Sequence, residues 1–362
     1  MKRLLFVLLI LAVSLSLFAS SFTSFMPLER EYRAMGCSGM SLKGVEKGFY
    51  INPASLSNDK FNLVLPSLEV GVGSFSEIIE VSSNAFNSDD FVDSANQVLS
   101  KLTGTIPILN INASSSLVLF GLGGSLNLSG GLNTSGEGLS VGLIPFLKIA
   151  SSFGYGHGFD ISDNMRLEVG GVAHVSSFFY SSPVGIAELV DVLATSTLDS
   201  IELKYTNTSF SMDLGTTLRL QNGFSFAMSL LDIGKGFDSV DIITGEKERV
   251  KSNFYLNVGS GWERVFWKWL GIKASLDFND IVGFVKNASF SNFLYHTNMG
   301  LKLNLTKGIG VMCGLKGGYP SLGADLKLWF IDLSVLYTMD EYSEYVGYNP
   351  RDTLSVLLRL EF

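Results

Sequence analysis

The last ten residues of the chain alternate between apolar and polar side chains. Every second position from Leu354 to Phe362 is apolar, and four of the five positions in the complementary set are polar. Neighbouring residues of a β-strand point to opposite faces, so this segment predicts a strand with one apolar face and one mostly polar face. The same alternation runs through residues 213–221, 272–279 and 322–330.

Roughly 12 to 14 segments of this kind follow one another, separated by clusters of Gly, Asn, Asp and Pro that are typical of turns. Such clusters stand at residues 160–164, 221–223 and 317–320. Alternating strands of about ten residues between turn signals are typical of an outer-membrane barrel, whereas a water-soluble sandwich has shorter strands. The pattern therefore favours an all-β fold, a transmembrane antiparallel β-barrel, with a secreted soluble β-protein as the alternative.

Two stretches depart from the strand rhythm and space their apolar residues as a helix does. Residues 90–102 begin with an acidic pair and continue with apolar positions three or four residues apart, and residues 184–198 show a similar spacing. This spacing is typical of amphipathic helices, so we expect two short helical excursions between strands. The pattern leaves open whether they plug the lumen, cover it or lie on the membrane surface.

The N-terminus has the order of a secretory signal. A short basic start, Met1 to Arg3, precedes an unbroken apolar run that ends in small residues near Ala19. The run is shorter than the about 20 residues that a membrane helix needs. We therefore expect residues 1–20 to be a signal peptide and residues 57–362 to form the barrel, with an uncleaved anchor as the alternative reading of the N-terminus.

The composition supports a membrane barrel and argues against a nucleic-acid partner. Only 17% of the residues are charged, yet the mean hydropathy is +0.31 and no second apolar run is long enough for a membrane helix. Apolar residues that alternate along strands and face lipid explain both values. The net charge of −8 and the absence of a basic run argue against binding to nucleic acid, which needs clustered Lys and Arg.

The sequence offers little catalytic chemistry. His157, His174 and His296 stand in different segments without a carboxylate or cysteine at ligand spacing, so each is expected to be a lone luminal or loop residue. No metalloprotease, nucleophile-elbow or phosphate-loop pattern is present. We expect no enzyme activity, no cofactor and no metal. Cys37 and Cys313 share no motif, and either one disulfide or two isolated thiols is compatible with the sequence.

The segment after the signal resembles the N-terminal signature of a known superfamily. Residues 33–58 read RAMGCSGMSLKGVEKGFYINPASLSN, and the positions that match the signature are Arg33, Ala34, Gly36, Gly39, Tyr50, Asn52, Pro53, Ala54 and Leu56. This pattern resembles that of the FadL-like outer-membrane β-barrels. Residues 212–234 and 314–362 resemble most the branch of that superfamily with the TraF-, PorV- and spirochaete-type barrels.

The resemblance implies a barrel of about 14 strands whose N-terminal segment, residues 21–56, folds into the lumen as a hatch. Its expected junction with the wall consists of Gly36, Gly39, Tyr50, Asn52, Pro53 and Ala54. A segment inside a barrel brings its backbone close to the wall, which favours Gly and Ala, and the polar luminal face can pair with its backbone groups. A periplasmic tail that simply enters the first strand is the alternative.

The resemblance also implies a function. We expect an outer-membrane protein of a diderm bacterium that forms a passive channel for small hydrophobic solutes, gated by the hatch. The alternative is a non-transporting, PorV-like barrel that anchors or assembles a partner or a secretion system.

The end of the chain resembles the signal that the barrel insertion machinery reads. The residues that carry this resemblance are Leu358, Leu360 and Phe362, an apolar row that ends in an aromatic residue. The expected partners are therefore outer-membrane lipid, that machinery, and either a hydrophobic small molecule or a partner protein.

Overall fold

The computed structural model describes residues 30–45, 48–58, 61–79, 107–137, 140–181, 205–234, 237–241, 247–250, 254–267, 270–286, 288–341 and 348–361. The expected signal peptide at residues 1–20 and the two expected helices at 90–102 and 184–198 lie outside these described residues.

Strands dominate the described residues. They are β1 (Phe61–Gly73), β2 (Pro107–Leu119), β3 (Leu122–Glu137), β4 (Ser140–Ser162), β5 (Met165–Tyr180), β6 (Tyr205–Leu220), β7 (Phe224–Ile233), β8 (Phe237–Asp241), β9 (Lys247–Val250), β10 (Tyr255–Val265), β11 (Gly271–Phe278), β12 (Thr297–Asn304), β13 (Ile309–Lys316), β14 (Tyr319–Leu328), β15 (Ile331–Glu341) and β16 (Pro350–Glu361). Two helices, α6 (Ile281–Lys286) and α7 (Phe290–His296), separate β11 from β12.

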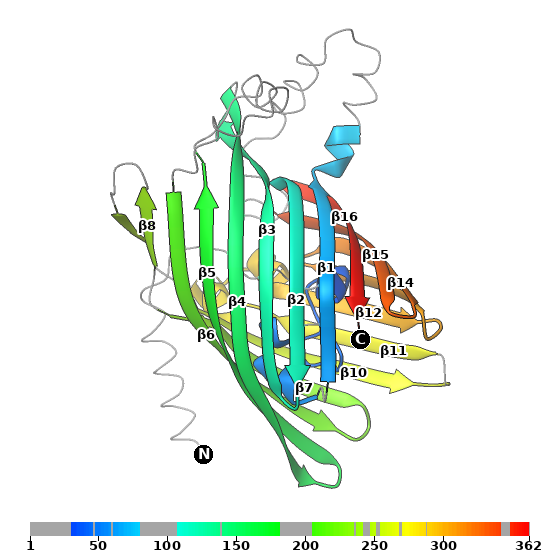
Figure 1. Cartoon of the computed structure of the whole chain (residues 1–362). Helices are drawn as coiled ribbons and strands as arrows, with labels where there is room; N and C mark the ends of the chain where they lie inside the picture. The colour runs from blue at the N-terminus through cyan, green and yellow to red at the C-terminus, as the bar shows by residue number, and fades with distance from the viewer. Residues whose placement is uncertain are drawn as a thin grey trace.

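The sheet closes on itself. Antiparallel neighbours follow chain order from β1 to β7 and from β10 to β16, β7 pairs with β10, β16 pairs with β1, and β5 pairs with β6. Within the described residues, β8 and β9 form a hairpin attached to β6, so fourteen of the sixteen strands make the ring. The predicted closed antiparallel barrel of about 14 strands is therefore confirmed. Figure 1 shows the strands arranged around a common interior.

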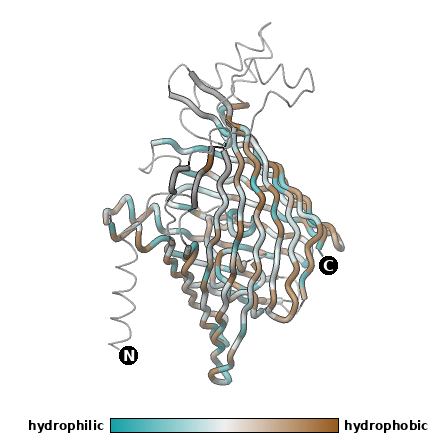
Figure 2. Tube along the Cα trace, turned by 60° about the vertical axis from the view of Figure 1, so that its left-hand side comes forward, coloured by the Kyte–Doolittle hydropathy of each residue, from teal (hydrophilic) through white to brown (hydrophobic). Residues whose placement is uncertain are grey.

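The alternation in the sequence separates the two faces of the wall. Polar residues at one parity point inward and are buried, such as Asp213 and Thr217 with 2% and 1% of their surface exposed. Apolar residues at the other parity point outward, and Leu126 and Phe153 are 57% and 66% exposed. Figure 2 shows the resulting mixture of brown and pale positions along the strands. A water-soluble protein would have to leave this apolar belt in water, which argues for lipid around the barrel.

The two ends of the barrel differ in their connections. Short turns join strands at residues 120–121, 163–164, 221–223, 305–308 and 329–330, while the connections at the other end include residues 74–106, 181–204 and 279–296. Phe120 and Gly121 both have positive φ, as a two-residue hairpin turn that follows the twist of the strands requires. We call these ends the short-turn end and the long-loop end. The first residues of β1 and the last of β16 lie at the short-turn end.

Residues 30–45 and 48–58, here called the plug, lie inside the ring (dark blue in Figure 1). The plug consists of α2 (Arg30–Ala34), two 3₁₀ turns, η2 (Gly48–Tyr50) and η3 (Pro53–Asn58), and the segments that link them. An eight-stranded barrel is filled by its own side chains, but a wider barrel needs a plug or retains a channel. The plug occupies that space. No helix of the described residues is long and apolar enough to span a membrane.

A charge on the outward face tests whether this wall meets lipid. Ile149→Lys, near the middle of β4, should lower the free energy of unfolding by about 2–4 kcal/mol, because lysine would face hydrocarbon. Ile161→Lys, on the same face of β4 but beside the short turn, should cost only about 0–1 kcal/mol. Urea titration of the protein in lipid vesicles measures both. Equal and small losses would contradict a lipid-facing wall, since Ile149 and Ile161 are 42% and 57% exposed.

Candidate functional site

The first residue of the described plug is fixed to the wall by an ion pair. The two terminal nitrogens of Arg30 lie 2.9 and 2.6 Å from the two carboxylate oxygens of Asp332 on β15. Arg359 on β16 approaches the same carboxylate at 2.5 Å. All three residues are at most 5% exposed. A two-point arginine–carboxylate contact of this kind fixes orientation as well as charge, so it sets the position of α2 against the wall.

The next residue, Glu31, pairs with a different part of the wall. Its carboxylate lies 3.1 Å from the Lys273 ammonium on β11 and 3.3 Å from that of Lys302 on β12. Burial favours the neutral acid, but the two ammonium groups outweigh it and lower the pKa of Glu31 from 4.5 to about 2. Glu31 is therefore ionised at neutral pH, and wall residues of both signs of charge hold α2.

Backbone contacts continue the attachment beyond α2. The Gly39 and Met40 amides donate to one oxygen of Asp277 on β11, at 2.7 and 3.0 Å. The plug and wall backbones also touch, because a methyl group on Gly314 would collide with the backbone of Met35 and Gly36. Glycine on both sides is what permits this approach.

The Asn-Pro-Ala sequence forms a second junction, on β5 and β6. The Asn52 side chain accepts a hydrogen bond from the Ala54 amide at 3.1 Å and donates to the Thr217 hydroxyl at 2.8 Å and to the Met40 carbonyl at 3.2 Å. The first bond is a local Asx turn, and the other two join the wall and an earlier part of the plug. Pro53 and Ala54 lie against Gly170, where a side chain would collide with the Pro53 carbonyl.

A buried ion pair in the wall supports this second junction. The Arg219 Nε lies 2.8 Å from both carboxylate oxygens of Glu168, and Glu168 is fully buried. A terminal nitrogen of Arg219 donates to the Ser41 carbonyl at 2.8 Å, and Asn58 donates to Glu168 at 3.1 Å. The wall pair thus binds the plug at two places along the chain.

Tyr50 contacts a third region, on β3. Its ring is 3% exposed, and its hydroxyl accepts a hydrogen bond from Asn127 at 2.5 Å and meets the Ser125 hydroxyl. The six candidate junction residues therefore do not form one cluster. Gly36 and Gly39 lie against the strands from β11 to β13, whereas the other four lie toward the wall from β3 to β6.

The candidate insertion signal lies on the face of the wall opposite to the plug contacts. Leu358 and Leu360 belong to β16, and Leu358 is 47% exposed on the outward face. Phe362 lies outside the described residues. Nothing in the structure links these residues to the lumen, and their role in insertion stays a prediction.

The structure reveals a hydrogen-bonded chain that the sequence analysis missed. The His174 ring lies between Ser152, 2.8 Å from Nδ1, and Asp213, 2.7 Å from Nε2. The expectation that each histidine stands alone is wrong here, because strand pairing brings β4, β5 and β6 together. All three residues are at most 6% exposed, and the ring of Tyr50 lies 6.0 Å from that of His174. The hydrogen-bonded group of Ser152, His174 and Asp213 is therefore buried between the wall and the plug.

The other histidines and the cysteines have separate surroundings. His157 lies on the outward face between Tyr155 and Phe159, with ring centroids 6.3 and 4.7 Å away, so its expected place in the lumen or a loop is also wrong. His296 is buried at the end of α7. Both cysteines are free thiols, Cys37 buried and Cys313 exposed on the outward face, which settles the open question of a disulfide. Among the described residues no group of side chains is arranged for a metal ion.

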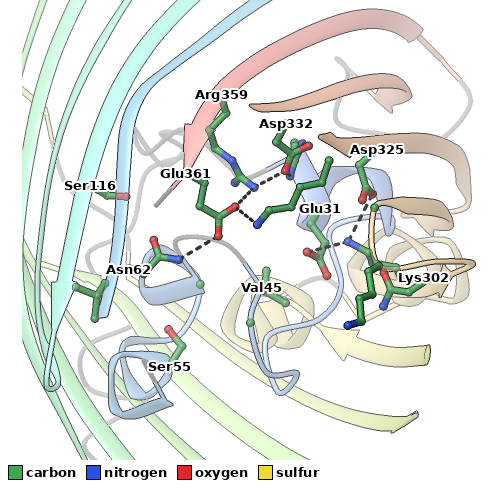
Figure 3. Close-up of a pocket in the computed structure, with 18 of the residues that line it drawn as sticks. Glu31, Val45, Ser55, Asn62, Ser116, Lys302, Asp325, Asp332, Arg359 and Glu361 are labelled. Carbon is green, nitrogen blue, oxygen red and sulfur yellow. Dashed lines mark hydrogen bonds and ion pairs between the residues drawn. The ribbon is translucent and has the colours of Figure 1, made fainter. Parts of the chain in front are cut away.

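A cavity of about 280 Å³ lies between the plug and the short-turn end (Figure 3). Its lining includes plug residues Arg30, Glu31 and Val45 and the last described residue of the wall, Glu361. Charged side chains of both signs surround it, namely Arg30, Glu31, Lys302, Lys307, Asp325, Lys327, Asp332, Arg359 and Glu361. A cavity lined this way is suited to water and small polar molecules.

Comparisons with known proteins identify distant structural likenesses and nothing closer. No family model matches the chain, and no curated protein matches it. The toluene transporter TbuX of Ralstonia pickettii is 8% identical over 94% of this chain and 99% of that chain, with a TM-score of 0.49. The toluene transporter TodX of P. putida is 10% identical over 93% and 98%, with a TM-score of 0.48. A Pseudomonas aeruginosa FadL homologue is 9% identical over 93% and 98%, with a TM-score of 0.43. These likenesses are too distant to carry an argument about function.

The Arg219–Glu168 pair offers a test of how the plug is held. Arg219→Met should lower the free energy of unfolding by about 3–5 kcal/mol, because it takes the closest cation away from a buried carboxylate. Adding Glu168→Gln should recover much of that loss. Arg166→Met is the matched control, since Arg166 is 40% exposed and lies 3.7 Å from Glu168, and it should cost less than about 1 kcal/mol. Urea titration followed by tryptophan fluorescence measures all three.

An equal loss of unfolding free energy in the single and double variants would show that the loss does not come from the charge left on Glu168. A loss in Arg166→Met as large as in Arg219→Met would show that the contact with the plug contributes nothing of its own.

Proposed function

We propose that the chain is an outer-membrane barrel of the FadL-like kind that lets small solutes cross passively when the plug is displaced. The observation that carries this proposal is the plug itself, which lies in a fourteen-stranded ring too wide to be filled by its wall. The motif at residues 33–58 supports the superfamily, and its TraF-, PorV- and spirochaete-type branch is part of the proposal. Because the short turns of such barrels face the periplasm, the charged cavity would lie on that side.

Solutes would meet an aromatic surface on the other side of the plug. Phe146, Phe178 and Tyr180 have the same parity as the inward-facing Ala150 and His174 and lie near the long-loop end. The ring centroids of Phe146 and Phe178 are 5.8 Å apart, and those of Phe178 and Tyr180 are 5.4 Å apart. This surface supports hydrophobic molecules as the solute class, because aromatic rings at a pore mouth favour apolar ligands.

A non-transporting barrel that anchors a partner is the second candidate. The firm attachment of the plug favours it. Arg30 is fixed to β15, Glu31 to β11 and β12, Gly39 to β11 and Asn52 to β6. A barrel that never opens would have no need of a plug that moves.

A reversible lock on the plug separates the two candidates. The Ser38 and Ser275 hydroxyls are 2.7 Å apart, so Ser38→Cys with Ser275→Cys should form a disulfide between plug and wall once Cys37 and Cys313 are replaced by alanine. Oxidation should abolish both single-channel conductance and uptake of toluene into vesicles, and dithiothreitol should restore them. Ser176→Cys with Ser209→Cys is the matched control, because those hydroxyls are also 2.7 Å apart but join two wall strands.

Unchanged passage through the oxidised plug–wall variant would overturn gating by the plug. Absence of passage in both variants, oxidised and reduced, would favour the anchoring barrel.

The solute class has its own test. Phe178→Asn should lower the rate of toluene uptake several-fold while the conductance of the open channel to potassium chloride stays the same. Phe179→Asn is the control, because Phe179 is the neighbouring residue of β5 and points to the opposite face. Equal toluene uptake in the two variants would contradict a role for the aromatic surface. The charged cavity would then determine which solutes pass.

A further inference from the structure

The helices α6 and α7 lie on the outside of the barrel. Asp280 caps α6 by accepting a hydrogen bond from the Gly283 amide at 2.9 Å, and Ser289 caps α7 through the Asn292 amide at 3.1 Å. Both helices pack on Phe278, whose ring centroid is 5.3 Å from that of Phe284 and 5.6 Å from that of Phe293. Phe278 has the parity of the outward-facing residues of β11, opposite to the buried Asp277. The pair therefore continues the outward face and does not enter the lumen.

The side of this helix pair away from the wall is apolar and uncovered. Val285 is 68% exposed and Phe290 is 78% exposed, and Phe293, Leu294 and Tyr295 are each between 39% and 44% exposed. Lys286 ends α6 and is exposed as well. Large apolar side chains with a neighbouring lysine are typical of elements that lie at the boundary between lipid and water.

The wall is shortest where these helices stand. The strands β11, β12 and β13 have 8 residues each, whereas β4 has 23. Eight residues at about 3.4 Å each, tilted by about 35–45°, span only about 19–22 Å across a membrane. The apolar belt of an outer-membrane barrel is about 25 Å tall. The wall on this side is therefore a few ångströms shorter than that belt, and α6 and α7 follow β11 at its long-loop end.

We infer that α6 and α7 form an interfacial membrane element that completes the apolar belt on the short side of the barrel. The occupant of their exposed face is the acyl and headgroup boundary of the outer leaflet. This choice rests on continuity, because Phe278 joins the helices to the outward row of β11, with Leu276 50% exposed just below it. Lipid that already covers that row covers the helices without a gap, and Lys286 reaches the headgroups. The inference rests on the proposed membrane location and is independent of transport.

Depth-dependent fluorescence quenching tests it. Single cysteines at Val285 and Phe290, in a chain with Cys37 and Cys313 replaced by alanine, would carry an environment-sensitive NBD label in vesicles made with brominated phosphatidylcholine. Both labels should emit at short wavelength and be quenched more by bromines near the headgroup than by bromines near the chain end. Ile149→Cys serves as the control for the middle of the wall and Asp163→Cys as the control for an exposed turn.

Emission from positions 285 and 290 that matches the Asp163 label, without quenching by any brominated lipid, would overturn the inference. Short-wavelength emission without lipid quenching, lost on dilution into more lipid, would overturn it too and assign the face to a second copy of the chain. Failure of the Ile149 label to be quenched would instead overturn the membrane location of the whole barrel. The position of α6 and α7 and the membrane location of the barrel can therefore be disproved separately.

Discussion

The pairing of β1 with β16 is the contact on which the architecture depends, because it joins the first strand to the last and turns an open sheet into a ring. Lipid offers no hydrogen bonds to an unpaired strand edge, so a membrane sheet must close. Closure then gives every strand an inside and an outside. Only in the closed ring do the two alternating sets of residues become a lumen face and a lipid face. A ring of fourteen strands also encloses a lumen too wide for the wall side chains to fill.

The plug and the wall match each other in charge and in bulk. Wall glycines stand where the plug backbone passes, with Gly314 against Met35 and Gly170 against Pro53. Charged wall residues stand where the plug carries a charge or an unpaired amide, as Asp332 does for Arg30 and Asp277 for Gly39. Buried ion pairs add little stability compared with apolar packing, but a mismatched one is costly. Their main effect is to specify one position of the plug among many.

The sequence predicted the parts of this structure that follow from local pattern. Alternation identifies strands and their outward residues, and the glycines and Asn52 mark a segment whose backbone runs close to other backbone. The partners of that segment could not be predicted, since Asp277, Thr217 and Glu168 look like any inward polar residue until register is known. The chain through Ser152, His174 and Asp213 was missed for the same reason, as alternation gives the face of a residue but not its neighbour across the sheet. The short length of β11, β12 and β13 was not predicted, because strand ends are poorly marked in sequence.

The arrangement of contacts also indicates where the plug yields first. Breaking the pairs of Arg30 and Glu31 exposes charges that need water, and the cavity of about 280 Å³ already borders both residues and two of their partners, Lys302 and Asp332. Separating Asn52 and Pro53 from β5 and β6 exposes packed backbone, and neither of these two residues lines that cavity. Hydration lowers the cost of parting charges far more than the cost of opening a tight apolar contact. Under the proposed gating, opening would therefore begin at α2, from the short-turn end, and the Asn-Pro-Ala junction would act as the hinge between plug and wall.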